Sequence, residues 1–479
     1  MAASDHRHPW LAALVCGAAA CNGSTGTLTL TLTEPSGATL LETDIQRIEV
    51  TLTSPPETAE ADRVGSGFTL SFSVDATGSD GQFFLQGFDG NANLIAVGET
   101  PPIPIAAIDA TLTIFVAPPL SIGASQSSLE DARRDLTAAA TTFGAVLVGG
   151  VSANGFASPS IEGFNAFTQS VGEFAPLTVP RVAPAVMVDS SDDLEIFAGS
   201  DQDGNPTGSA FELDLDNGGS GTIVDITPSN GSSFARGAAL ALPLDTLDEF
   251  AISGTPALEY ATPSTVAAVT MTGVTAAAAP GAAVVGSDGA VTAIFAGDGN
   301  PGTGIVRFHA ESIDLPTGNP SVLRHGHAVA GAPGGVIIEL GGVIDGGGSG
   351  SGSGSDEPTA DAVLFDPVAG TATVKPSILM TARLNPAVAA TSRYLIVAGG
   401  QSDDVACTTT TPCTLVPTVE VLDATTFALV TTLNLVVPRT NASAIALPND
   451  QILIVGGTDE NGAPTGTVEL FTPDLPAGF

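Results

Sequence analysis

The sequence is poor in basic, aromatic and sulfur-containing side chains. Its 479 residues include 13 Lys and Arg against 51 Asp and Glu, which gives a formal net charge of −38, and Lys375 is the only lysine. There are one Trp, two Tyr and four Cys. Binding to phosphate backbones needs clustered Lys and Arg, so this charge excludes a nucleic-acid-binding protein. A chain of 479 residues is long enough for a large buried core, so it is not a small fold held together by disulfide bonds alone.

Long apolar runs are also missing. The run at residues 10–20 is about half as long as a membrane-spanning helix requires, and no later run is longer. Arg7 precedes this run, and three alanines end it directly before Cys21. A basic start, a short apolar run and small residues at its end predict a signal peptide at residues 1–20.

The small residues before Cys21 resemble the lipobox of bacterial lipoproteins. This resemblance implies a lipidated Cys21 at the start of a tether at residues 21–25, with the lipid as the protein's only membrane contact. It places the protein in the bacterial cell envelope, and Asn22 in place of Asp implies the outer membrane. The alternative of plain secretion, with cleavage near Ala20, stays open.

The chain contains 56 Gly and 34 Pro, yet 43% of its residues are hydrophobic. Turn-rich β-structure reconciles these values, and we expect an all-β fold. Within residues 26–118, alternation of apolar and polar residues predicts strands of a small β-sandwich, with a hairpin turn at Asp89-Gly90-Asn91. The alternating segments are 27–32, 48–52, 68–72 and 112–116.

Residues 119–479 contain an internal repeat. Apolar strands end in glycine at intervals of 43 to 58 residues, at Gly150, Gly199, Gly254, Gly297, Gly342, Gly400 and Gly457. An arginine precedes six of these glycines by 16 to 18 residues, at Arg134, Arg181, Arg236, Arg324, Arg383 and Arg439. Chance placement of so scarce a residue is improbable, so these positions are predicted to be structural residues of the repeat.

Further apolar segments containing Glu follow the glycines, at 210–213, 418–421 and 467–470. Each repeat therefore predicts four strands, as in a propeller blade, and seven repeats predict seven blades, or six if a degenerate copy does not form one. We expect each arginine to bond carbonyls or the Glu of the repeat, and so to tie one blade to the next. We expect the closing strand of the ring at 112–116 or close by.

With its glycine pairs and the segment Arg324-His325-Gly326-His327-Ala328, the repeat resembles the Kelch family of β-propellers. The resemblance implies a Kelch-type propeller over residues 119–479. It departs from the family in lacking a Trp in the fourth strand, because Trp10 is the only Trp of the chain.

Cys407 and Cys413 remain as one pair if the signal peptide is removed and Cys21 carries lipid. Export to an oxidising compartment predicts a disulfide between them, and two free thiols remain the alternative. A zinc site is not expected, because two further soft ligands are missing.

Two features of the sequence bear on metal binding, one on calcium and one on copper. Asp201, Asp203 and Asn205 alternate like the start of a calcium loop, but similar turns after other glycines favour a hairpin turn. Some Kelch-type propellers that follow a β-sandwich are copper radical oxidases. After export, however, only Tyr260, Tyr394, His309, His325 and His327 could serve as such ligands. We therefore expect no cofactor and no catalytic residue.

These features predict a non-catalytic, monomeric envelope lipoprotein whose propeller presents loops to a protein or ligand that the sequence does not identify. The alternative is an enzyme or carbohydrate-active protein with an axial pocket. Clustered carboxylates at one rim would favour an enzyme, and dispersed ones would favour binding.

Overall fold

The computed structural model describes residues 14–17, 27–70, 79–105, 110–189, 192–215, 221–227, 324–344, 357–366 and 369–479, and the backbone of the strands between residues 240 and 314. The fold is all-β, as expected. The helical segments of this described part are a five-residue π-helix, η1 (Leu40–Asp44), and a 3-10 turn, η2 (Pro333–Gly335). Neither has the length or the apolar character of a membrane-spanning helix.

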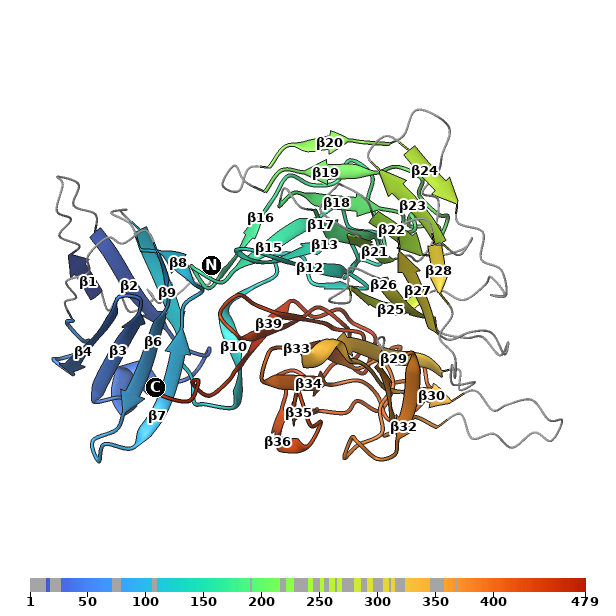
Figure 1. Ribbon diagram of the computed structural model, residues 1–479. Helices are drawn as coiled ribbons and strands as arrows, with labels where there is room; N and C mark the ends of the chain where they lie inside the picture. The colour runs from blue at the N-terminus through green and yellow to red at the C-terminus, as the bar shows by residue number, and fades with distance from the viewer. Residues whose placement is uncertain are drawn as a thin grey trace.

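The N-terminal part consists of two sheets that share one apolar core, here called the sheet pair (Figure 1). The first sheet contains β1 (Leu14–Gly17), β2 (Thr27–Thr33) and β9 (Ala110–Phe115), and the second contains β4 (Pro56–Asp62), β3 (Arg47–Thr53), β6 (Phe83–Phe88) and β7 (Leu94–Glu99). The short strands β5 (Asp80–Gly81) and β8 (Ile103–Pro104) also pair. In β3, alternate side chains are buried, as the sequence pattern predicts.

The expected strand at 68–72 is wrong in its described part. Phe68 and Leu70 lie outside any strand, and residues 71–72 are outside the described residues. Both side chains are nevertheless buried in the core of the sheet pair. Alternation of apolar and polar residues indicates which side chains are buried. A loop that crosses an apolar core can bury alternate side chains without joining a sheet.

Seven four-stranded antiparallel sheets, units 1 to 7, make up the described part of the chain after residue 120. Unit 1 contains β12 (Thr137–Thr141), β13 (Gly144–Val148), β15 (Ile161–Asn165) and β16 (Ser170–Glu173), and unit 2 contains β17 (Ala185–Val188), β18 (Leu194–Phe197), β19 (Phe211–Leu213) and β20 (Ile223–Asp225). Unit 3 contains β21 (Leu240–Pro243), β22 (Phe250–Ser253), β23 (Leu258–Thr262) and β24 (Thr265–Ala268), and unit 4 contains β25 (Pro280–Val285), β26 (Val291–Phe295), β27 (Ile305–His309) and β28 (Ser312–Asp314).

Unit 5 contains β29 (Arg324–Gly331), β30 (Ile337–Ile344), β31 (Ala362–Asp366) and β32 (Thr371–Lys375), and unit 6 contains β33 (Ala387–Ala390), β34 (Tyr394–Ala398), β35 (Thr418–Asp423) and β36 (Leu429–Asn434). Unit 7 contains β37 (Ser443–Ala446), β38 (Ile452–Val455), β39 (Thr467–Thr472) and β10 (Ser121–Ser128). The two-residue strands β11 (Arg133–Arg134) and β14 (Val151–Ser152) pair beside unit 1.

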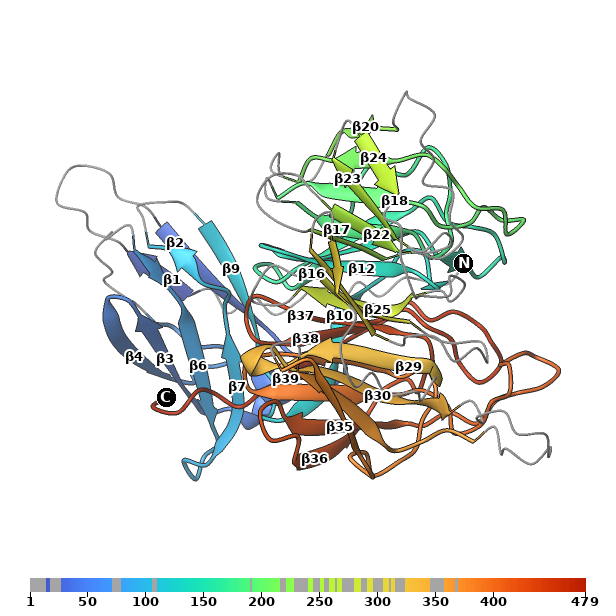
Figure 2. The same ribbon diagram turned by 45° about the vertical axis from the view of Figure 1, so that its right-hand side comes forward.

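The first strands of successive units contact one another from β12 to β37, and β37 in turn contacts β12. Figures 1 and 2 show the sheets following one another around this part of the molecule. Among the described side chains, apolar cores lie between units 7 and 1, units 1 and 2, units 5 and 6, and units 6 and 7. The strands β13, β34 and β38 are thereby covered on both faces, which explains their continuous apolar sequences.

The strand that completes unit 7 comes from before unit 1, but it is not the segment 112–116. β10 pairs antiparallel with β39, whereas β9 runs parallel to β2 in the sheet pair. Because β9 is paired with β2 over six residues, the next segment of the chain is the one that reaches unit 7.

Candidate functional site

Five arginines are buried among the described residues of the units, at Arg133, Arg181, Arg324, Arg383 and Arg439. In unit 1 the prediction was wrong by one position, because Arg133 is buried whereas the side chain of Arg134 is 41% exposed. Arg133 and Arg134 are adjacent, so both fit the spacing of the repeat. Their side chains point to opposite sides of β11, and only the structure shows which one is buried. Arg236 lies outside the described residues.

Arg439 shows how these side chains are held. Its Nε donates to the carbonyl of Val437 (3.0 Å), and its Nη1 donates to the carbonyls of Gly456 (3.2 Å) and Thr467 (2.8 Å). Its Nη2 pairs with Glu469, which also accepts the main-chain N–H of Val437 (3.0 Å). Burial lowers the pKa of Arg439, and the Glu469 carboxylate opposes that shift. Arg133 with Glu162 and Arg383 with Glu420 repeat the arrangement.

Units 2 and 5 hold their arginines differently. Phe211 occupies the third-strand position that Glu420 occupies in unit 6, and Arg181 lies over its ring, 4.8 Å from the centroid. The expected equivalence of Glu212 with Glu420 was therefore wrong by one residue. In unit 5 the acidic residue is Glu339 on the second strand, 4.0 Å from Nε of Arg324.

The expectation that the guanidinium ties one unit to the next is wrong, because each bonds within its own unit. The main chain makes the link instead. The N–H of Gly400 in unit 6 donates to the carbonyl of Arg439 in unit 7 (2.9 Å), and Gly342 and Gly150 donate in the same way to Arg383 (2.9 Å) and Arg181 (2.8 Å).

The described closing glycines, Gly150, Gly199, Gly342, Gly400 and Gly457, all have positive φ. At Gly400, φ is 92°, and a Cβ atom would lie 2.6 Å from the carbonyl oxygen of Leu384. Only glycine fits this turn without strain. Gly254 and Gly297 lie outside the described residues.

The second residue after each buried arginine has a left-handed backbone, at Asp135 (φ 53°), Ala183 (φ 46°), Gly326 (φ 59°), Asn385 (φ 50°) and Asn441 (φ 54°). These residues bond from unit to unit. The N–H of Asn385 donates to the carbonyl of Gly326 (2.6 Å), and the N–H of Asn441 donates to that of Asn385 (3.2 Å). Asp, Asn and Gly tolerate this conformation best, so the pattern Arg-x-Asp/Asn/Gly was a signal that the sequence analysis missed.

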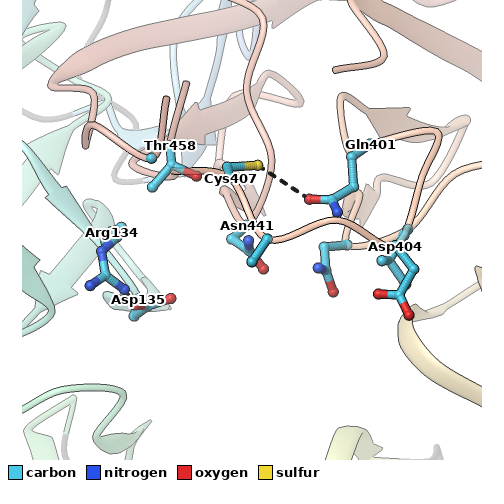
Figure 3. A pocket seen from close by; sticks show the side chains of 11 residues that line it. Arg134, Asp135, Gln401, Asp404, Cys407, Asn441 and Thr458 are labelled. Carbon is cyan, nitrogen blue, oxygen red and sulfur yellow. Dashed lines mark hydrogen bonds and ion pairs between the residues drawn. The ribbon is translucent and has the colours of Figure 1, made fainter. Parts of the chain in front are cut away.

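Three of these left-handed residues line a polar pocket of about 550 Å³ between units 1, 6 and 7 (Figure 3). The lining residues are Arg134, Asp135, Leu384, Asn385, Gln401, Asp404, Ala406, Cys407, Asn441, Thr458 and Gly462. In Figure 3, Arg134 and Asp135 lie on one side of the pocket, and Gln401 and Asp404 lie on the other. Amide groups, carboxylates and one guanidinium thus converge on a single space.

The disulfide between Cys407 and Cys413 closes the loop that forms one wall of this pocket. The loop is also fixed by hydrogen bonds. The N–H of Cys413 donates to the carbonyl of Glu460 in unit 7 (3.1 Å), and Nε2 of Gln401 donates to the carbonyl of Val405 (3.0 Å). The wall is therefore held from both unit 6 and unit 7.

Two carboxylates of the pocket have basic side chains beside them. Arg134 forms an ion pair with Asp135, and Nε2 of His325 lies 3.5 Å from Asp404. His327 is buried instead. Its Nδ1 lies 3.1 Å from the carbonyl of Arg324, and burial lowers its pKa.

The calcium candidate forms a hairpin turn. Oδ1 of Asp201 accepts the N–H groups of Asp203 (2.9 Å) and Asn205 (2.8 Å), and these bonds lower the pKa of Asp201. Asp459 and Asp89 cap their turns in the same way. Among the described residues, no group of three or more His, Cys, Asp or Glu side chains is placed to bind a metal ion. The lipidation candidate Cys21 is outside the described residues.

No protein-family model matches the sequence, and no curated protein is similar to it. A solved structure of a fungal alcohol oxidase of the AA5 family, in complex with copper, is similar in fold. The similarity covers 72% of this chain and 74% of the oxidase, with a TM-score of 0.52 and 14% sequence identity. At this identity the similarity shows the fold alone.

The described side chains of this chain do not fit a copper site. The hydroxyl of Tyr394 donates to Asp474 (2.7 Å), and His325 and His327 face Asp404 and Arg324. The side chains of Tyr260 and His309 lie outside the described residues. The donor atoms needed for copper chemistry therefore do not converge in the described part of the chain.

Proposed function

We propose that units 1 to 7 close into a seven-bladed propeller of the Kelch type, preceded by a β-sandwich that the sheet pair forms. The contact of β37 with β12 supports this architecture, and so does the pairing of β10 with β39, which joins the two ends of the ring. The repeated buried arginines support the family.

The propeller binds a small saccharide in the polar pocket. The observation that carries this proposal is the convergence of Asn385 and Asn441 with two carboxylates on one space of about 550 Å³. Amides both donate and accept hydrogen bonds, as sugar hydroxyls do, and the volume is that of a site for a small ligand.

Titration calorimetry with glucose, galactose, N-acetylglucosamine and cellobiose tests this function. Asn385→Gly and Asn441→Gly remove the amides but keep the left-handed backbone, as Gly326 does naturally. Ser377→Gly is the matched control, since Ser377 also has positive φ and is exposed away from the pocket. We expect both pocket variants to weaken binding at least about tenfold, which corresponds to about 1.4 kcal/mol. Binding of none of the four sugars, or equal effects of all three variants, contradicts the proposal.

A second candidate is a glycoside hydrolase that uses Asp135 and Asp404. Both carboxylates line the pocket, and glycoside hydrolysis commonly uses a pair of carboxyl groups. Incubation with cellobiose distinguishes the two functions. Release of glucose that is lost in both Asp135→Asn and Asp404→Asn supports the hydrolase, and binding without release supports the binding protein.

The cellular location of the protein is also proposed. Cleavage after Ala20 would remove β1 and leave β2 and β9 as the first sheet. Lipidation of Cys21 would then place the protein in the outer membrane of a bacterium, as a monomer held by its lipid. Mass spectrometry of the mature N-terminus tests this. A diacylglyceryl mass on Cys21 supports the lipoprotein, and an unmodified N-terminus near Ala20 supports plain secretion.

A further inference from the structure

The sheet pair and unit 7 meet at a buried carboxyl group. Glu99 ends β7 and is 5% exposed. Its main-chain carbonyl accepts a hydrogen bond from Nδ2 of Asn449 in the β37–β38 turn (3.3 Å), and its Oε2 accepts one from Nε2 of Gln82 (3.3 Å). Its Oε1 is buried without a hydrogen-bond partner. An ionised carboxylate in this position would lack solvation at one oxygen.

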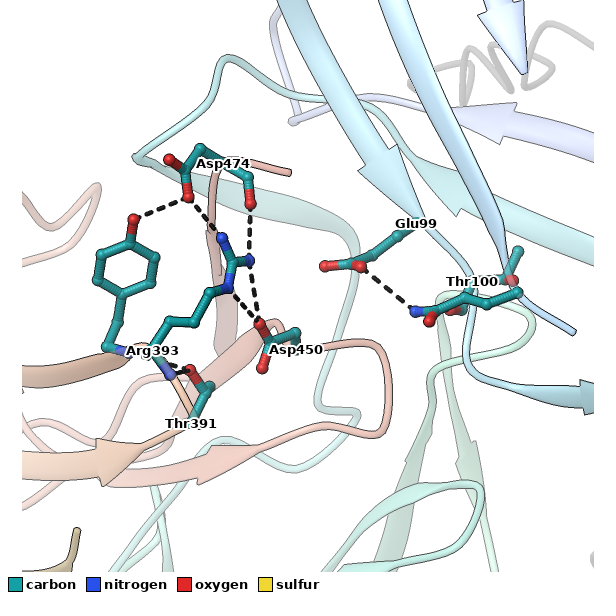
Figure 4. A network of polar contacts seen from close by, with 8 residues as sticks. Glu99, Thr100, Thr391, Arg393, Asp450 and Asp474 are labelled. Atoms are coloured by element: carbon teal, nitrogen blue, oxygen red, sulfur yellow. Dashed lines mark hydrogen bonds and ion pairs between the residues drawn. The ribbon is translucent and has the colours of Figure 1, made fainter. Parts of the chain in front are cut away.

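The groups that face Glu99 come from three segments (Figure 4). Arg393, in the β33–β34 turn, bonds Oδ2 of Asp450 in the β37–β38 turn (3.0 Å) and Oδ1 of Asp474 after β39 (2.7 Å). The hydroxyl of Tyr394 also donates to Asp474 (2.7 Å). Arg393 is therefore shared by the carboxylates of Asp450 and Asp474. Its single positive charge can balance only one of the three negative charges that would be present if Glu99 were ionised.

The same segment that carries Asp474 fastens the two parts of the molecule. After β39 the chain runs back to the sheet pair, where the ring of Phe479 lies 4.3 Å from that of Phe84. Figures 1 and 2 show this return of the C-terminus. Repulsion between Glu99 and Asp474 would therefore act directly on the junction.

We propose that Glu99 is a proton-operated latch, which holds the sheet pair against units 6 and 7 while it is neutral and loosens this junction when it loses its proton to solvent. A neutral carboxyl group donates as well as accepts hydrogen bonds, so it does not repel the facing carboxylates. Neither Glu99 nor the charged groups that face it line the polar pocket, so the latch does not depend on the proposed saccharide binding.

The direction of the pH dependence follows from the charges. Burial and then Asp450 raise the pKa of Glu99 to about 8, while Arg393 opposes the shift. A carboxyl group whose folded-state pKa is raised stabilises the fold fully below its unfolded pKa, and this contribution is lost as pH rises through the folded pKa. The junction should therefore be tightest below about pH 4.5, the ordinary pKa of a glutamate, and should weaken progressively as pH rises to about 8.

The test compares the full chain with Glu99→Gln and with the control Glu212→Gln. Glu212 lies in β19, away from the junction, and burial and neighbouring carboxylates raise its pKa too. Scanning calorimetry gives Tm, and small-angle scattering gives the radius of gyration, from about pH 5 to about pH 10. We expect Tm to fall and the radius of gyration to increase between about pH 5 and about pH 8 in the wild type and in Glu212→Gln, with a plateau above about pH 8, and neither change in Glu99→Gln.

At low pH, Glu99→Gln should match the wild type, because glutamine imitates the neutral carboxyl group. Asp450→Asn removes a facing charge and should move the wild-type transition to lower pH. A fall in Tm between about pH 5 and about pH 8 that persists in Glu99→Gln overturns the latch, and so does a wild type without any expansion in this range.

Discussion

Arg439 offers the sharpest test of how the units are stabilised. Its guanidinium is fully buried, donates to three carbonyls and pairs with Glu469, whose side chain is also fully buried. Arg439→Ala leaves Glu469 as a charge without its cation and removes the donors of those carbonyls. Removing one partner of a buried ion pair costs about 3–5 kcal/mol, and we expect a loss in this range.

Urea unfolding followed by circular dichroism, together with scanning calorimetry, measures this loss. Arg47→Ala is the control, because Arg47 and Glu60 form an exposed pair, which is worth at most about 1 kcal/mol. The double variant Arg439→Met with Glu469→Leu should recover part of the loss, since it leaves no unpaired charge, while the three carbonyls and the N–H of Val437 stay without these partners. If Arg439→Ala costs no more than Arg47→Ala, the buried arginine does not stabilise its own unit.

Two further substitutions probe the same framework. Gly400→Ala forces a side chain onto a φ of 92° and against the carbonyl of Leu384, and we expect a loss of about 1–3 kcal/mol in urea unfolding. An unchanged stability there would mean that the turn rearranges freely. Arg324→Ala should cost less than Arg439→Ala, because Nε and Nη2 of Arg324 lack hydrogen-bond partners and Glu339 is 4.0 Å away. Equal losses in the same assay would show that the carbonyl contacts, rather than the carboxylate, determine the cost.

The repeat was visible in the sequence because two constraints recur at fixed spacing. A glycine is needed where the chain turns with positive φ, and an arginine satisfies carbonyls inside units 1, 2, 5, 6 and 7. Finer details were missed where neighbouring residues compete for one position. Arg133 and Arg134 are adjacent candidates, and in unit 2 an aromatic ring, Phe211, replaces the expected carboxylate.

The pocket and the junction depend on contacts between distant segments, and the sequence analysis did not find them. Asp135 and Asn441 meet at one pocket although they are far apart in the chain. Glu99 is an ordinary end of a strand in the sequence, and only the return of Asp450 and Asp474 to its side makes it unusual. Local sequence patterns predict strands and turns. Contacts between segments that are far apart in the chain depend on how the units pack against one another.

An experimental crystal structure of the mature chain tests the central claim, that the units close on themselves around a polar pocket. We expect β37 to lie beside β12 and β10 to pair with β39. We also expect Asp135, Asn385 and Asn441 to line one pocket between units 1, 6 and 7. A structure with β37 and β12 apart, or with β10 paired elsewhere, would contradict it.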